Sequence, residues 1–177
     1  MSIIVVMFCV FPARAQGQSV EDFSVKTDNN SIVVSFSLAL NHKNAQEIKQ
    51  GLDKDIRFYV DLFRVWKVWP DEFVLGKKYL RTLKSDPIKK EHVASSNDGS
   101  IIIEKRFRSL ESMLDWSLSV NDLQLTNTED LEPGSYFVKV TIESRVRNLP
   151  PVIGYLFIFL PENEFKIEKK SSRFLLE

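Results

Sequence analysis

The chain has a single cysteine, six glycines and two histidines in 177 residues, and these low counts exclude several classes of protein. Cys9 has no second cysteine with which to form a disulfide. His42 and His92 have no other histidine or cysteine at ligand spacing, so we expect no zinc site. The glycines form no phosphate-binding loop, and no serine lies in a G-x-S-x-G motif. The sequence therefore predicts no metal and no cofactor.

A net charge is also missing, because 24 basic residues balance 24 acidic ones. The net charge thus gives no attraction to nucleic acid, and we expect no nucleic-acid partner. No apolar run approaches the roughly 20 residues that a membrane-spanning helix needs. We expect no integral membrane segment once the N-terminal signal described next has been removed.

The most informative stretch is the N-terminus, where nine apolar residues, 3–11, are followed by Ala13-Arg14-Ala15. A short apolar stretch that ends in small-x-small is typical of a secretory signal peptide with its cleavage site. We therefore expect residues 1–15 to be removed, and a periplasmic or secreted protein that begins at Gln16. No basic residue precedes the apolar run. Either the true start lies upstream of Met1, or the segment is a buried N-terminal strand.

The remaining 162 residues, 16–177, have the length of a single domain with a substantial core. Apolar and polar residues alternate with a period of two in several segments, which is the pattern of half-buried strands. These segments are 31–40, 56–65, 101–107 and 136–146. Asn97-Asp98-Gly99 is typical of a hairpin turn. The pattern predicts a mainly β protein, an antiparallel β-sandwich of about seven to nine strands with two short helices.

The two helices are indicated by capping residues. Asn44 is predicted to cap the first, which ends at Gly51, and Ser109 to cap the second. Leu110, Met113 and neighbouring leucines form an apolar stripe on the second helix, either plugging one end of the core or binding a partner.

Two C-terminal segments complete the strand prediction. Residues 152–160, VIGYLFIFL, are predicted to form a central core strand, the alternative being an exposed strand that pairs with a partner. The basic run at 166–173 is typical of an edge strand protected by lysines.

Charged residues suggest no catalytic site. The adjacent acids Asp53 and Asp55 lie beside expected turns, as do two similar pairs near residues 130 and 163, and solvated loop charge explains them better than paired acid–base catalysis. Arg145 and three other arginines alternate on strand surfaces, where cross-strand pairing with acids such as Glu143 is the expected use.

The densest aromatic segment includes Tyr59, Trp66 and Trp69. In one long strand, two tryptophans three residues apart point to opposite faces, so at most one of them belongs to the core. Trp66, Trp69 and Tyr59 are therefore the candidate binding residues, with closure of the sandwich rim as the structural alternative.

The order of these features resembles a bacterial domain-of-unknown-function family of exported proteins. The features are the signal, the short helix ending at Gly51, the strand 56–64 running into Trp66 and Trp69, the turn Leu131-x-Pro133-Gly134-x-Tyr136, and Leu149-Pro150-Pro151. The resemblance implies a β-sandwich, no known active site, and genes often beside a membrane sensor kinase of the nitrogen-regulation type.

We therefore expect a non-catalytic binding or accessory protein of the bacterial cell envelope, modulating a membrane sensor, with an envelope or membrane protein as partner. The alternative is an envelope hydrolase that acts on carbohydrate or peptide.

Overall fold

The computed structural model of the chain describes residues 17–146 and 164–177. Within these residues, ten strands form two antiparallel sheets, joined by two α-helices and one short 3-10 helix. The first five strands are β1 (Ser19–Asp28), β2 (Ser31–Ala39), β3 (Lys54–Val65), β4 (Glu72–Asp86) and β5 (Glu91–Asn97). The others are β6 (Ile102–Phe107), β7 (Ser119–Asn127), β8 (Gly134–Val146), β9 (Phe165–Lys170) and β10 (Phe174–Leu176). The predicted fold class is confirmed, with one strand more than expected.

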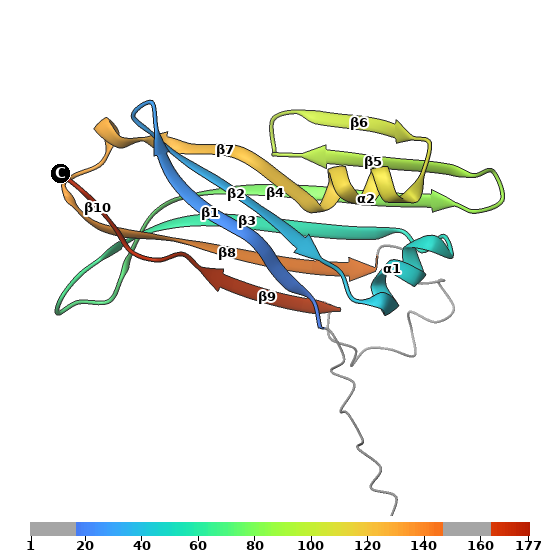
Figure 1. Ribbon diagram of the computed structural model, residues 1–177, viewed down its shortest axis with the longest axis horizontal. Coiled ribbons are helices and arrows are strands. Elements are labelled where there is room, and N and C mark those ends of the chain that lie inside the picture. The colour runs from blue at the N-terminus through green and yellow to red at the C-terminus, as the bar shows by residue number, and fades with distance from the viewer. Residues whose placement is uncertain (1–16, 147–163) are drawn as a thin grey trace, which may run out of the picture.

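The smaller sheet, β1-β2-β7, lies across one face of the larger sheet, whose strand order is β10-β8-β3-β4-β5-β6 with β9 also paired to β8 (Figure 1). Alternate residues of both sheets point into the space between them and are almost completely buried. Val34 and Phe36 come from β2, and Phe58 and Val60 come from β3. The rings of Phe36 and Phe58 lie 5.9 Å apart, so the two sheets meet in a continuous apolar core.

Each helix carries the chain from one sheet to the other. α1 (His42–Lys49) follows β2 and leads into β3, and α2 (Leu110–Leu118) follows β6 and leads into β7. Ser109 caps α2 as predicted, and Met113 and Leu118 are buried against the sheets. The apolar stripe of α2 therefore plugs the core.

Arg81 of β4 closes the C-terminal end of α2. Its Nη1 donates hydrogen bonds of 2.7–2.8 Å to the carbonyls of Trp116, Ser117 and Ser119. The guanidinium lies between the rings of Phe58 and Trp116, at 5.5 and 5.3 Å from their centroids. Burial lowers the pKa of this guanidinium. A half-buried cation thus donates hydrogen bonds to the last carbonyls of a helix that lies against the sheet.

The predicted cap of α1 was wrong by three residues. Asn41 is the cap, and its side chain accepts a hydrogen bond of 2.9 Å from the backbone N–H of Asn44. Asn44 lies inside the helix and is buried, because its side-chain oxygen accepts a hydrogen bond from Lys54 of β3. Gly51 has the expected positive φ, +94°, just after the helix.

β9 pairs with β8 and, in residues 17–146 and 164–177, with no other strand; its lysines are exposed, as expected for a protected edge. The predicted signal peptide at 1–15, the turn at 149–151 and the predicted core strand at 152–160 lie outside the described residues.

Candidate functional site

The loop between β3 and β4 projects from the end of the molecule that also holds the C-terminus (Figure 1). β3 ends at Val65, so Trp66 and Trp69 both lie in this loop rather than in the strand. Their exposed fractions are 42% and 75%, and that of Val68 between them is 88%. The strand predicted at 56–65 ends at Val65, as expected. The argument that two tryptophans of one long strand point to opposite faces therefore does not apply, and neither tryptophan belongs to the core.

Arg64 fixes the base of this loop. Its guanidinium donates hydrogen bonds to the Glu132 carboxylate and, at 2.9 Å, to the carbonyl of Pro133, and it lies 4.5 Å from the centroid of the Trp66 ring. The hydrogen bond to Glu132 raises the pKa of Arg64. The indole N–H of Trp66 donates to Glu72 at 3.0 Å. Trp66 is thus held on two sides, whereas Trp69 extends from the protein.

A second segment, the turn at 131–133 together with the start of β8, packs against the Arg64 side chain. A Cβ atom on Gly134 would lie 3.1 Å from Nε of Arg64, so the glycine allows the arginine to approach closely. The Tyr136 hydroxyl donates to the Glu132 carbonyl at 2.6 Å, and the buried Tyr136 ring stacks on Phe174 of β10. The β3–β4 loop, this turn and β10 together form a surface that we call the aromatic tip.

Two open hollows flank Arg64 and Trp66, and they differ in charge. The first, of about 630 Å³, is lined by both tryptophans, by apolar groups of the loop, the turn and β10, and by the cations Arg64, Lys67 and Arg173. Among the residues that the structure describes, no carboxylate lines it. The second, of about 460 Å³, is lined by Arg64 and by the acids Glu72, Asp130 and Glu132. Aromatic side chains line both hollows, but the aromatic tip separates a side lined by cations from a side lined by three acids.

Tyr59, the third predicted binding residue, does not belong to the aromatic tip. It lies seven residues before Trp66, which corresponds to about 23 Å along an extended strand, and the Lys78 ammonium lies 5.6 Å from the centroid of its ring. The structure places Trp66 and Trp69 on one surface and leaves Tyr59 on the outer face of the larger sheet.

An aromatic cluster that sequence reasoning missed continues from the tip onto this outer face. The ring of Phe63 stacks on Phe137 at 5.3 Å and meets Phe73 edge-on at 5.8 Å. Lys139 and Lys170 lie 5.0 and 4.9 Å from the centroids of the Phe63 and Phe137 rings. The cross-strand pairing of Phe63 with Phe73 and Phe137 is the reason that these rings meet, and only the strand register reveals it.

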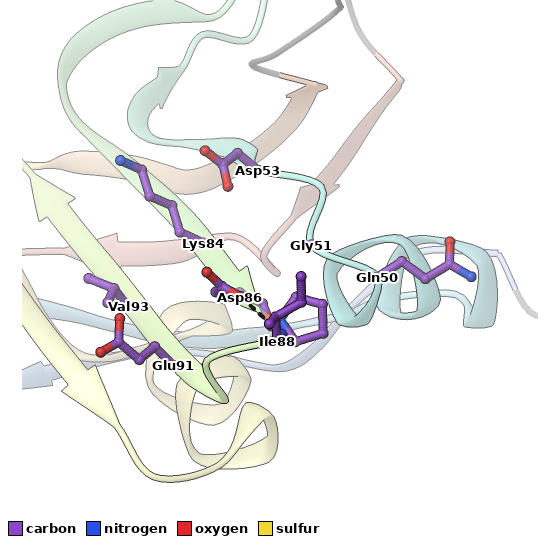
Figure 2. Close-up of a pocket in the computed structure, with 10 residues that line it drawn as sticks. Gln50, Gly51, Asp53, Lys84, Asp86, Ile88, Glu91 and Val93 are labelled. Atoms are coloured by element: carbon purple, nitrogen blue, oxygen red, sulfur yellow. Dashed lines mark hydrogen bonds between the residues drawn. The ribbon is translucent and has the colours of Figure 1, made fainter.

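A third hollow, of about 500 Å³, lies at the opposite end of the molecule, between the end of α1 and the turn that joins β4 and β5. Figure 2 shows the carboxylates of Asp53, Asp86 and Glu91 spread around it rather than paired. Backbone N–H groups of the turn donate to Asp86 and lower the pKa of its carboxyl. Asp86 therefore stabilises the turn, as expected for loop carboxylates. In the described ranges, no group of three or more histidine, cysteine or acidic side chains is arranged to hold a metal.

A buried ionic cluster at this end was also missed. Lys54 is 1% exposed, and its ammonium contacts Glu47 of α1 and, at 2.8 Å, Glu164 just before β9. Asn44 accepts a hydrogen bond from the same ammonium, and the Ser144 hydroxyl donates to Glu164. Because this cluster joins α1, β3, β8 and the start of β9, it acts as a structural anchor.

The family described as "Domain of unknown function (DUF4390)" matches residues 15–172. The chain belongs to this family. The resemblance inferred from the sequence is thus confirmed at the level of an uncharacterised domain family. No curated protein and no solved structure matches the chain. Within residues 17–146 and 164–177 there is no helix of the length and apolar character that a membrane span requires.

Proposed function

We propose that this DUF4390 protein is an exported, non-catalytic accessory protein of the bacterial cell envelope that binds its partner through the aromatic tip. The observation that carries the proposal is the exposure of Val68 and Trp69 on a loop whose base is fixed by Arg64. Large apolar groups that are clustered and exposed are typical of interaction surfaces, and tryptophan is among the residues that contribute most to binding energy.

The fixed base of the tip supports binding because it lowers the entropy cost of association. Trp66 is held by Arg64 and Glu72, so it does not need to be ordered when a partner binds. Trp69 then provides a further large contact surface at the apex. With Trp66 held in place and Trp69 exposed, the binding surface is largely preorganised.

The hydrolase alternative receives no such support from the described residues. A glycosidase-type mechanism needs two carboxyls that converge on one point, one of them with a raised pKa. Burial raises the pKa of Asp61, Lys139 lowers it, and the nearby carboxylate of Glu168 raises it further. Asp61 lies on the outer face of the larger sheet beside Lys139, away from the acids of the hollow in Figure 2, and neither Asp61 nor Glu168 lines any of the three hollows described above.

Export and sensor modulation belong to the same proposal. The apolar run followed by Ala13-Arg14-Ala15 supports export, and the family match begins at residue 15, after that run. N-terminal sequencing of the exported protein is expected to start at Gln16, and an intact Met1 in the cytoplasmic fraction would contradict export. The gene neighbourhood implied by the family resemblance supports a membrane sensor as the process that the protein modulates.

Cosedimentation of the purified, exported chain with envelope membranes of its own bacterium tests the binding surface. We expect Trp69→Ala to lose most of the sedimented fraction. Ile88→Ala is the matched control, because Ile88 is 92% exposed in the turn at the opposite end of β4. A wild type that stays in the supernatant, or two variants that sediment equally, would contradict the proposal.

A further inference from the structure

The apex of the aromatic tip, formed by Val68, Trp69 and Leu175, is apolar and exposed. The loop between β3 and β4 projects from this end of the molecule (Figure 1). Val68 and Trp69 in this loop are 88% and 75% exposed, and Leu175 of β10, which lines the same hollow, is 78% exposed. A bilayer accommodates a projecting apolar apex, because such groups enter the boundary between headgroups and acyl chains to a depth of about 5–10 Å. Tryptophan is enriched at this boundary, since its ring is apolar and its N–H is polar.

The hollow beside this apex is complementary to an anion. Lys67 and Arg173 are exposed cations on its lining, and within the described residues neither forms an ion pair. Arg64 adds a third cation, although it is shared with Glu132. The acids Glu72, Asp130 and Glu132 line the other hollow. Although the net charge of the chain is zero, charges are separated locally at the tip. The side that carries Lys67 and Arg173 therefore attracts negatively charged groups.

We infer that the aromatic tip binds the anionic surface of a lipid bilayer, with Val68 and Trp69 inserted at the interface and Lys67 and Arg173 beside lipid phosphates. The inference rests on the proposed function and names the partner of that surface. A protein partner would need the same residues to fit a fixed complementary surface. The fluid bilayer requires only an apolar apex and adjacent basic groups, and the tip provides both.

Sedimentation with protein-free vesicles tests the lipid directly. The exported chain is mixed with phosphatidylcholine vesicles, with and without phosphatidylglycerol, at low and high salt. We expect binding to the vesicles that contain phosphatidylglycerol and a marked loss at high salt, because charge attraction to the lipid surface is screened. Each basic residue near an anionic bilayer contributes about five-fold to binding, so Lys67→Glu is expected to weaken it by about twenty-five-fold.

Matched controls come from the opposite end of the molecule. Lys89→Glu makes the same charge change in the exposed turn between β4 and β5, and Ile88→Ala removes an exposed apolar group there. We expect both controls to bind like the wild type, and Trp69→Ala to lose more than about ten-fold, since its apolar surface no longer leaves water. Tryptophan emission should shift to the blue on binding in the wild type.

Four outcomes would overturn the inference. Equal weakening by Lys67→Glu and Lys89→Glu would show that the attraction is not confined to the tip. Binding that does not depend on phosphatidylglycerol would show that anionic lipid is not what the tip recognises. If protein-free vesicles do not bind while native envelope membranes still sediment the wild type but not Trp69→Ala, the partner is a protein, and the proposed function stands without the lipid. Absence of both kinds of binding would contradict the two proposals together.

Discussion

Truncation of the two tryptophans of the aromatic tip to alanine should lower the free energy of unfolding less than truncation of a core residue does. Trp69 is 75% exposed, so only about a quarter of its side chain, roughly 60 Å² of a side chain of about 250 Å², is removed from water on folding. At about 25 cal/mol per Å², Trp69→Ala costs at most about 1.5 kcal/mol of the free energy of unfolding. Trp66 is 42% exposed, and the same estimate gives about 3.5 kcal/mol. Phe58 is completely buried, and Phe58→Ala should cost about 3–5 kcal/mol.

Urea denaturation of the three variants, followed by far-ultraviolet circular dichroism, measures these differences through the midpoint and slope of each transition. Circular dichroism avoids the tryptophan signal that the substitutions remove. The expected order of destabilisation is Trp69→Ala, then Trp66→Ala, then Phe58→Ala. A loss of more than about 3 kcal/mol for Trp69→Ala, twice the upper estimate from buried area, would refute the reasoning, since it would show that this tryptophan contributes to the folded core.

Three further predictions concern charged groups that are buried or half-buried. Lys54→Met leaves two glutamates facing each other without their cation and should destabilise the protein by about 3 kcal/mol in urea denaturation; an unchanged midpoint would show that the cluster is not an anchor. Arg81→Leu removes the donor from three carbonyls at the end of α2 and should cost about 3 kcal/mol, with faster amide hydrogen exchange in that helix, whereas unchanged exchange would contradict the capping role. Burial raises the pKa of Asp61 above 3.8, so the wild type loses stability as the pH rises through this raised pKa. Asp61→Asn should therefore gain more stability over the wild type at neutral pH than below pH 3.8, and a gain that does not depend on pH would contradict the burial.

Local patterns in the sequence predicted much of the fold. The alternation in β2 identified its buried face, since Val34 and Phe36 are almost completely buried. The hairpin turn before β6 has Gly99 at φ +96°, as Asp-Gly turns require. Ser109 caps α2, and β3 is a central strand between β4 and β8. These features depend on residues close together in the chain, which is why the sequence alone was sufficient.

Features that depend on distant residues were not predictable. The alternating pattern placed the end of β3 at Val65, but it gave no signal that the loop that follows exposes both tryptophans. The position of Arg64 depends on Glu132, 68 residues away in the chain. The buried ammonium of Lys54 donates a hydrogen bond to Glu164, 110 residues away in the chain. It also donates to the side chain of Asn44, which therefore does not cap α1 as predicted. No local pattern contains these pairings.

The most direct test of the aromatic tip as a binding surface is photo-crosslinking from single positions in the living cell. Benzoylphenylalanine replaces Trp69 in one protein and Ile88 in another, two exposed apolar positions at opposite ends of β4. We predict a discrete envelope adduct, lipid or protein, from position 69 and none from position 88. Equal crosslinking from both positions, or an adduct from position 88 alone, would contradict the assignment of binding to the tip.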